Sequence, residues 1–281
     1  YHMLHLIMSK GRVLYLHRFA QRLSIFYAKT SALRKRLIKL GYTPVYLNAP
    51  LKLTPAQFPS SDALSKFSTV VATEDEETLY RAWWIRPSTE SNAVELDEAI
   101  DTIRKYVKDG EIIPDLPEMQ NKQDSSENPK SDNDTSQPPI VGLIGFSQGA
   151  GFAGLLARKF KKLFEVENDL EFVIVYSGFL VDDPKQKDYY APGQDAFKML
   201  HVIGELDTLV DEERAMKLYK PYEAVSDVLK HPGGHFVPNS KLLIDQVVNW
   251  LQNPRASETA KESKEDTVDD LLDMMEGFGK V

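Results

Sequence analysis

The sequence contains no cysteine, which excludes a disulfide framework, a thiol nucleophile and a cysteine-based zinc site. Such a composition agrees with a reducing compartment, and we expect a cytoplasmic protein. A surplus of basic residues is also lacking, because 34 Lys and Arg stand against 42 Asp and Glu, for a net charge of −8. The clustered positive charge of a nucleic-acid-binding surface is therefore not expected.

Long hydrophobic runs are missing as well. No apolar stretch approaches the roughly 20 residues needed to cross a bilayer, so no membrane span is expected. Residues 1–8 lack a cationic start and a small-residue cleavage site, so they do not resemble a signal peptide, and we expect the folded domain to begin near Met8. The hydrophobic content of 42% over 281 residues is nevertheless ample for the core of one large domain.

The most specific pattern of the chain joins a short apolar run to a run of small residues. Ile140–Ile144 predicts a buried strand and Ala150–Phe160 a helix. Between them, Gly145-Phe146-Ser147-Gln148-Gly149 fits the Gly-x-Ser-x-Gly nucleophile elbow, a strained turn that exposes the serine hydroxyl. The N–H of Gln148 would then face a developing oxyanion from a helix N-terminus. The five residues alone would also fit an ordinary Gly/Ser turn between a strand and a helix.

Strand-like and helix-like segments alternate along the rest of the chain, which predicts an α/β fold with a mostly parallel central sheet and helices on both faces. Further strands are expected at Arg12–Leu16, Val45–Leu47, Phe172–Tyr176, Met199–Ile203 and Val225–Leu229. Further helices are expected at Ser24–Leu40, Ala93–Lys108, Glu212–Tyr222 and Lys241–Gln252.

Two segments do not fit this pattern. Pro114–Pro139 is nearly free of large apolar residues and predicts a disordered insertion, because it cannot bury enough surface to offset its ordering entropy. The fold would then occupy residues 8–252, followed by an acidic, mostly disordered tail at 253–281 with 4 cationic and 8 acidic side chains. Val268–Met275 has apolar residues at helical spacing within this tail. It predicts either a helix that binds a protein partner or a fraying end.

A nucleophilic serine needs a base, and the base needs a carboxylate that orients it. In α/β-hydrolases the acid and then the histidine follow the serine along the chain. Of the six histidines, only His201, His231 and His235 follow Ser147, and His201 lies within a predicted strand. His235 is the preferred base, because Gly233-Gly234 lets the backbone swing it back over the sheet.

The preferred carboxylate is Asp207, just past the carboxyl end of a buried strand and behind Gly204. Glu205 and Asp211 share the same loop and remain weaker candidates, and all three could also be solvated acids. In serine hydrolases of this type, the loop after the first strand supplies a second oxyanion N–H, which here would come from Phe19. On its own, that loop would pass for a polar turn.

Aromatic residues indicate where a substrate would lie. Trp83 and Trp84 are adjacent, and neighbouring side chains of a strand point to opposite faces. We therefore expect one of them in the core and the other in the wall of a substrate pocket. Phe179, after the turn at Gly178, is a third candidate for substrate binding.

Four ordered motifs resemble the fungal "family of serine hydrolases", small esterases related to a human ovarian-cancer-associated hydrolase. The resemblance covers roughly Met8 to Leu251. The motifs are Leu16-His17-x-Phe19-x-Gln21, Gly145–Gly149, Gly204-Glu205-Leu206-Asp207 and His231-Pro232-Gly233-Gly234-His235-Phe236-Val237-Pro238. The resemblance implies an α/β-hydrolase fold. The residue roles that it implies are a catalytic triad of Ser147, Asp207 and His235, an oxyanion hole formed by the N–H groups of Phe19 and Gln148, and an aromatic segment near the pocket at Trp83-Trp84.

One departure from the family pattern concerns the oxyanion loop. The family has glycine after the first histidine, where this chain has Arg18. If that backbone needed a positive φ, an arginine there would cost about 1–2 kcal/mol. The expected function is a carboxylesterase that cleaves a small or acyl-chain ester through an acyl-serine intermediate, without metal or cofactor. The alternatives are a thioesterase of the same mechanism and a binding module in which Arg18 has impaired catalysis.

Overall fold

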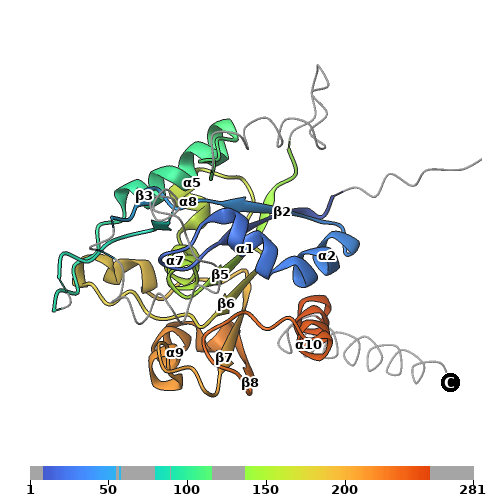
Figure 1. The fold of residues 1–281 in the computed structure, drawn as a ribbon. Helices are drawn as coiled ribbons and strands as arrows, with labels where there is room; N and C mark the ends of the chain where they lie inside the picture. Colours follow the sequence, from blue (N-terminus) through green and yellow to red (C-terminus); the bar gives the residue numbers. More distant parts are fainter. Residues whose placement is uncertain (1–8, 55–56, 58–79, 89, 116–136, 254–281) are drawn as a thin grey trace, which may run out of the picture. The chain divides into compact units, whose positions relative to one another are not determined.

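The computed structural model describes residues 9–54, 57, 80–88, 90–115 and 137–253, and it divides the chain into two compact units. The first unit, Tyr1–Ser240, contains the sheet and most of the helices (Figure 1). The second, Lys241–Val281, contains helix α10 at Lys241–Gln252, with the bounds expected from the sequence. That residues 8–252 form one domain stays a prediction.

The first unit is built on a parallel sheet in the strand order β2-β1-β5-β6-β7-β8, and every neighbouring pair in it runs parallel. The prediction of an α/β fold with a mostly parallel sheet is therefore confirmed. The strands are β1 (Gly11–Leu16), β2 (Tyr42–Leu47), β5 (Ile140–Phe146), β6 (Phe172–Tyr176), β7 (Lys198–Gly204) and β8 (Ser226–His231). A separate antiparallel pair is formed by β3 (Leu51–Lys52) and β4 (Arg81–Ala82).

Helix α7 (Gln148–Leu156) lies directly against the middle of this sheet, and all of its residues are buried. Two glycines make this close approach possible. A Cβ at Gly149 would lie 2.1 Å from the carbonyl oxygen of Leu16, and one at Gly145 would lie 2.3 Å from the carbonyl oxygen of Gly149. Any side chain at either position would push the helix away from the strands.

The helix expected over Ser24–Leu40 is two helices, α1 (Leu23–Lys29) and α2 (Ser31–Lys39), which meet at Thr30. The Thr30 hydroxyl donates to the Phe26 carbonyl oxygen at 2.8 Å and shares a 2.6 Å hydrogen bond with the Tyr46 hydroxyl. A threonine side chain that bonds to the preceding turn competes with the backbone ladder, and this explains the break.

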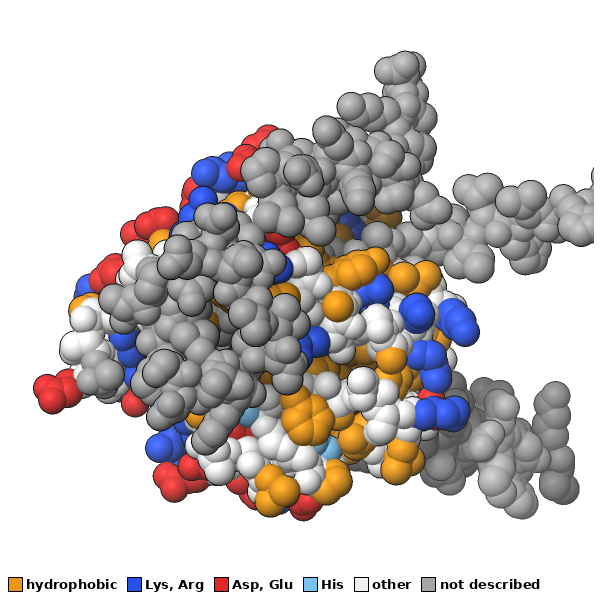
Figure 2. Space-filling model, in the orientation of Figure 1, with side chains coloured by type: hydrophobic (Ala, Val, Ile, Leu, Met, Phe, Trp, Pro, Cys, Tyr) orange, Lys and Arg blue, Asp and Glu red, His pale blue; other side chains and the backbone are white. Residues whose placement is uncertain are grey.

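The outer face of α2 is cationic. Its sequence contains Arg34, Lys35, Arg36 and Lys39 and no acid, while Leu33 and Leu37 are buried. Figure 2 shows Lys and Arg side chains gathered over this helix. The apolar stripe with a polar opposite face is the pattern by which the sequence predicted a surface helix here.

Helix α5 begins at Asp97, four residues later than the sequence predicted, and ends at Asp109. The N–H of Val94 donates instead to the Asp183 carboxylate at 2.8 Å, and its carbonyl accepts from the Gln186 amide. These bonds hold Val94 in an extended segment. The C-terminus is closed by Gly110, whose φ of 70° is the left-handed conformation typical of a helix stop.

The remaining elements are helices α8 (Phe160–Phe164) and α9 (Glu212–Tyr219) and the 3-10 segments η3 (Pro184–Tyr190) and η4 (Lys220–Val225). No helix in the described part of the chain is both long and apolar enough to span a membrane.

The two ends of the predicted insertion belong to the folded part. Asp115 is buried, and its carboxylate accepts hydrogen bonds from the Ser24 N–H at 2.7 Å and the Asn48 amide at 2.6 Å. Gln137 and Pro138 accept hydrogen bonds from the Arg12 guanidinium. The predicted insertion is therefore narrower than Pro114–Pro139. Its remainder at 116–136 and the acidic tail at 254–281, with the expected partner-binding segment, lie outside the described residues.

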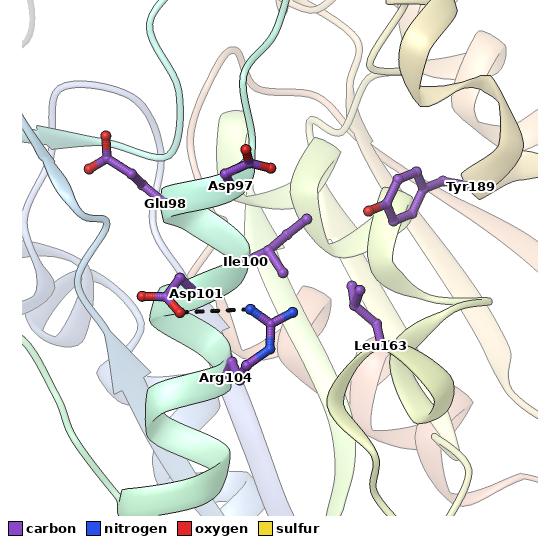
Figure 3. Close-up of a pocket in the computed structure, with 7 residues that line it drawn as sticks. All are labelled: Asp97, Glu98, Ile100, Asp101, Arg104, Leu163 and Tyr189. Carbon is purple, nitrogen blue, oxygen red and sulfur yellow. Dashed lines mark ion pairs between the residues drawn. The ribbon is translucent and has the colours of Figure 1, made fainter.

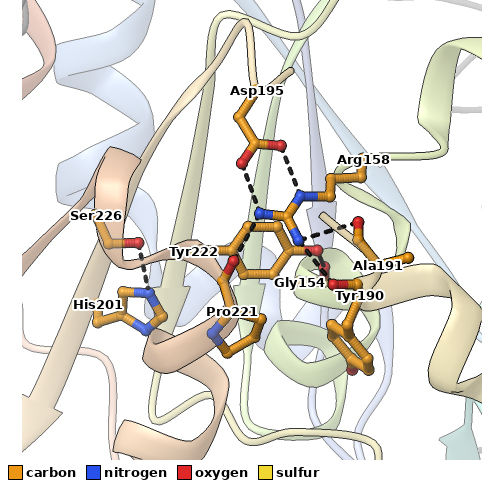
Figure 4. Close-up of polar contacts among 9 residues, drawn as sticks. All are labelled: Gly154, Arg158, Tyr190, Ala191, Asp195, His201, Pro221, Tyr222 and Ser226. Atoms are coloured by element: carbon orange, nitrogen blue, oxygen red, sulfur yellow. Dashed lines mark hydrogen bonds and ion pairs between the residues drawn. The ribbon is translucent and has the colours of Figure 1, made fainter. Parts of the chain in front are cut away.

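A buried ion pair between Arg158 and Asp195 lies just after the C-terminal end of α7 and joins three connecting segments (Figure 4). The Arg158 guanidinium donates to both oxygens of Asp195 at 2.7 Å, and only 9% and 7% of the two side chains are exposed. It also donates to the carbonyl oxygens of Tyr190 at 2.8 Å and Pro221 at 2.6 Å. The Tyr222 ring lies 4.4 Å from the guanidinium carbon, and its hydroxyl donates to the Gly154 carbonyl of α7.

We predict that Arg158→Ala lowers the free energy of unfolding by about 3–5 kcal/mol, because it removes the positive charge that balances a buried carboxylate. The matched control is Lys161→Ala, whose ion pair with Asp169 is about half exposed and should contribute no more than about 1 kcal/mol. Urea unfolding of both variants measures the difference. Equal losses would show that the Arg158 pair does not stabilise the fold.

Candidate active site

Ser147 lies between the last residue of β5 and the first residue of α7, in a strained backbone conformation with φ 51° and ψ −113°. Its N–H donates to the Tyr176 carbonyl at 2.9 Å, and its own carbonyl accepts from the Gly151 N–H at 2.9 Å. An L-residue adopts such angles only where its surroundings enforce them, at a cost of about 1–3 kcal/mol. The local geometry is that of the elbow expected from the sequence.

Asp207 and His235 are brought together by two loops that leave neighbouring strands. The His235 Nδ1 atom lies 2.8 Å from Asp207 Oδ2. The loops are joined by backbone hydrogen bonds, including Leu206 N–H to the Gly233 carbonyl at 3.0 Å. Gly204 permits this contact, because a Cβ there would lie 2.6 Å from the carbonyl oxygens of Gly233 and Gly234.

The imidazole of His235 also lies next to the elbow. Its ring centroid is 5.0 Å from that of Phe146, the residue that precedes Ser147. The three residues expected to form a triad therefore converge at the carboxyl edge of the sheet, although they are far apart in the sequence.

Asp207 is held as an anion. Its Oδ1 atom accepts the N–H groups of Leu209 and Val210, both at 2.9 Å, while Oδ2 accepts from His235 and Ser177. Burial raises the pKa of Asp207, but the hydrogen bonds from His235, Val210 and Ser177 outweigh it and lower the pKa to about 2. The competing acids are placed differently. Glu205 is exposed, and Asp211 accepts the Arg214 N–H as the N-cap of α9.

Ser177 is a site residue that the sequence reading missed. Its hydroxyl donates to Asp207 Oδ2 at 2.7 Å, its side chain is buried, and its φ of 48° is a second strained position. The sequence contains part of the signal, because Ser177 directly follows the apolar run of β6. That β6 pairs with β7, the strand that leads to Asp207, is visible only in the structure. Carboxyl ends of adjacent parallel strands meet at one sheet edge.

His17 holds the oxyanion loop in place. Nε2 of its ring accepts the Ala49 N–H at 3.0 Å, so Nδ1 must carry the proton that is donated to the Arg18 carbonyl at 2.8 Å. Burial lowers the pKa of His17 to about 4, which keeps the ring neutral. The His17 carbonyl accepts the Trp83 indole N–H at 2.9 Å.

The backbone strain considered for Arg18 lies at a different residue of the same loop. The positive φ of this loop, 52°, belongs to Ala20, and Arg18 has no positive φ. The Arg18 side chain is half-buried, and burial lowers its pKa. Its N–H points toward the Gln21 side chain at 3.4 Å. Phe19, the expected oxyanion donor, is half-buried in the turn between Arg18 and Ala20.

Gln148 connects the elbow to the two tryptophans. Its amide oxygen accepts the Trp83 N–H at 2.8 Å, and its amide nitrogen donates to the Trp84 carbonyl at 2.8 Å. Trp83 has no exposed surface and packs on Phe152, so it supports the site from the core. Trp84 packs edge-on against Phe179, with 6.2 Å between the ring centroids, and both rings are almost completely buried.

The other late histidines lie away from this cluster or support it. His201 is buried in β7 and hydrogen-bonds to the Ser226 hydroxyl at 3.2 Å (Figure 4). His231 is also buried, and its Nδ1 accepts the Gly233 N–H at 3.2 Å. His235 is thus the histidine that contacts the Asp207 carboxylate, as the sequence predicted.

A surface hollow of about 520 Å³ lies elsewhere (Figure 3). It is lined mainly by α5, together with Leu163 and Tyr189, and two of the lining residues, Arg104 and Asp101, form an ion pair. None of the residues expected to act in catalysis lines it. This hollow is therefore not the active site expected from the sequence.

Comparison with known proteins identifies the family. Residues 7–247 match the model of the family described as "Serine hydrolase (FSH1)". The chain belongs to this family. It is 36% identical to "Family of serine hydrolases 3" of Saccharomyces cerevisiae, across 97% of this chain and 99% of the relative. It is 27% identical to "Esterase OVCA2" of Danio rerio, across 81% of this chain and 90% of the relative.

Solved structures support the fold. The crystal structure of esterase PE8 superposes with a TM-score of 0.51 at 16% identity, covering 87% of this chain and 93% of that chain. Family membership confirms the expectation of a serine hydrolase, and the sheet topology together with the superposition confirms the expected α/β-hydrolase fold.

The buried histidines predict a loss of stability in acid. Burial lowers the pKa of His201 to about 4, as it does for His17, while an unfolded histidine titrates near 6.5. Below pH 6.5 these two histidines therefore bind protons in the unfolded chain but not in the folded protein. The free energy of unfolding consequently falls as the pH drops toward 4. His201 alone should contribute up to roughly 3 kcal/mol to this fall.

The variant His201→Gln tests this, because glutamine can bond to Ser226 without titrating. The free energy of unfolding, measured between pH 7 and pH 4, should fall less in the variant than in the unchanged protein. The same fall in both proteins would mean that His201 is not held neutral by the fold.

Proposed function

We propose that the protein is a carboxylesterase in which Ser147 attacks the ester carbonyl, His235 acts as general base and Asp207 orients His235. The observation that carries this proposal is the 2.8 Å contact between His235 Nδ1 and Asp207 Oδ2, beside a serine in a strained elbow. Membership of a serine hydrolase family supports it, as does the name "Esterase" of a relative that shares most of its length with this chain.

The hydrogen bond to Asp207 decides which nitrogen of His235 can act as the base. Because Nδ1 donates to a carboxylate, Nε2 of the neutral ring carries a lone pair and can accept the proton of the Ser147 hydroxyl. The anionic Asp207 then stabilises the imidazolium that forms. The same ring delivers the proton to the leaving alcohol, and it next activates the water that hydrolyses the acyl-serine.

The negative charge on the reacting oxygen would be stabilised by two backbone N–H groups. One is the Gln148 N–H at the first position of α7, where the helix dipole adds to the hydrogen bond. The other is the Phe19 N–H, in a loop that His17 and Trp83 hold by three hydrogen bonds. Because Arg18 avoids the strained conformation, it gives no reason to expect an impaired oxyanion loop, and the alternative of an inactive binding module loses its main support.

The substrate would be a small or acyl-chain ester. Trp84 and Phe179, whose rings pack on one another, would form an apolar wall of the substrate site. Leu206, Leu209 and Phe236 are exposed apolar side chains on the loops that carry Asp207 and His235. A thioester would react by the same steps. The absence of cysteine agrees with action in the cytoplasm.

We predict that Ser147→Ala lowers kcat by at least about 10⁴-fold, since triad members act as a unit. Ser147→Gly should be equally inactive, but it should unfold at a higher temperature than Ser147→Ala, because glycine adopts positive φ without strain. Hydrolysis of p-nitrophenyl esters and thermal unfolding measure the two effects. Substantial turnover by either purified variant would contradict the assignment of the nucleophile.

Ser177→Ala removes one of the donors to Asp207. A hydrogen bond to a charged group is worth about 1.5–3 kcal/mol, so we predict a fall in kcat of roughly 10-fold or more. Ser226→Ala is the matched control, because its hydroxyl bonds to His201 instead of Asp207. Identical rates in the two variants would show that Ser177 does not help to hold the carboxylate.

A further inference from the structure

A half-buried arginine lies beside the proposed active site without a carboxylate partner. Arg214 forms no ion pair within the described part of the chain, although several exposed lysines do. The two nearest acids are engaged elsewhere, Asp207 with His235 and Asp211 with the N-terminus of α9. A partly desolvated cation without a counter-charge is unfavourable, unless a ligand supplies that charge.

Two contacts fix the guanidinium of Arg214. Its carbon lies 4.3 Å from the centroid of the Phe179 ring, and its NH1 group donates to the Leu209 carbonyl at 2.9 Å. The second contact ties it to the loop of Asp207, two residues before Leu209. The other guanidinium N–H groups have no hydrogen-bond acceptor within the described residues.

Phe179 connects this arginine to the nucleophile. A Cβ built on Gly151, in the first turn of α7, would lie 3.0 Å from the Phe179 carbonyl oxygen and 3.5 Å from its ring. The Gly151 N–H is itself bonded to the Ser147 carbonyl. Phe179 therefore contacts both Arg214 and the first turn of α7, the turn that follows Ser147.

A second cation is close by. Arg86 follows Trp84 by two residues, and the Trp84 ring packs on Phe179. Burial lowers the pKa of Arg214, and the like charge of Arg86 lowers it further, while the nearby carboxylates of Asp211 and Asp207 raise it. Arg86 is exposed and has no acidic partner among the described residues. Because Asp207 and Asp211 already accept hydrogen bonds from other groups, the two like charges of Arg214 and Arg86 raise the local positive potential.

We propose that Arg214, with Arg86 beside it, binds an anionic group of the substrate, a carboxylate or a phosphate, against the ring of Phe179. The planar guanidinium fork matches the oxygens of either group and can bond to them in a bidentate manner. The inference rests on the proposed esterase function, and it assigns a preference for anionic esters to the same site.

Matched substrates separate the two possible anions. Mono-p-nitrophenyl glutarate and p-nitrophenyl pentanoate have acyl groups of equal carbon number, and only the first carries a carboxylate. The butyryl thioester of coenzyme A carries phosphates, together with the pantothenate and adenosine groups, that the butyryl thioester of N-acetylcysteamine lacks. If replacing Arg214 changes the preference for the anionic substrate within one of the two pairs, the proposal is supported and that pair identifies the anion. If the preference changes in neither pair, the proposal is wrong.

The variant Arg214→Gln should lower kcat/KM for the anionic substrate by about 10-fold to 100-fold, the value of one to two charge-assisted hydrogen bonds, mainly through a higher KM. The neutral partner substrate should change little. Arg214→Lys keeps the charge and should retain part of the preference. Lys217→Gln removes a charge from the exposed face of the same helix and is the matched control.

Two results keep the test independent of how well the variants fold. With the unchanged protein, added salt should weaken kcat/KM for the anionic substrate more than for the neutral one. Equal losses on neutral and anionic substrates in Arg214→Gln would mean that Arg214 only supports the Asp207 loop, and would overturn the proposal. Failure of the proposed function itself looks different, because Ser147→Ala would then still hydrolyse the neutral ester.

Discussion

The structure depends on the contact of one helix end with the backbone of the sheet. The first turn of α7 is pressed so closely against β1 that Gly149 leaves no room for a Cβ beside the Leu16 carbonyl. This contact sets the position of Ser147, of the Gln148 N–H, and of the loop that begins at His17. Gly145 and Gly149 have no side chains, so the helix can approach the strands closely. This close approach requires the strained backbone conformation of Ser147.

Charge around the site is distributed unevenly. Asp207 is surrounded by donors from Ser177, His235 and two backbone N–H groups, so its negative charge is satisfied within the protein. Arg214, a few residues further along, has one carbonyl and one aromatic ring. In the proposed mechanism the charge of Asp207 orients the base, whereas the charge of Arg214 remains available to bind a ligand. Asp207 lies in the loop between β7 and α9, and Arg214 lies in the first turn of α9 and donates to the Leu209 carbonyl of that loop.

The strained turn at Ser147 and the contact between Asp207 and His235 could be predicted from the sequence, because each follows from local chemistry and chain order. Glycines flank Ser147, Gly204 precedes Asp207, and Gly233-Gly234 precedes His235. The sheet could be predicted because its central strands are continuous apolar runs. Ser177 could not be predicted in the same way, because its role depends on strand order, which places β6 between β5 and β7. The positive φ at Ala20 instead of Arg18 and the helix break at Thr30 depend on tertiary hydrogen bonds, which local propensity does not encode.

The most direct test of the account is the site of covalent labelling by a fluorophosphonate. The probe reacts with a serine only where a base removes the proton and an oxyanion hole stabilises the adduct, so it reports on the whole arrangement at once. Mass spectrometry of the digested, labelled protein should find the adduct on Ser147 alone, formed in stoichiometric yield and with a rate that falls when His235 is replaced by alanine. Labelling of a different serine, or no labelling of the folded protein, would contradict the account.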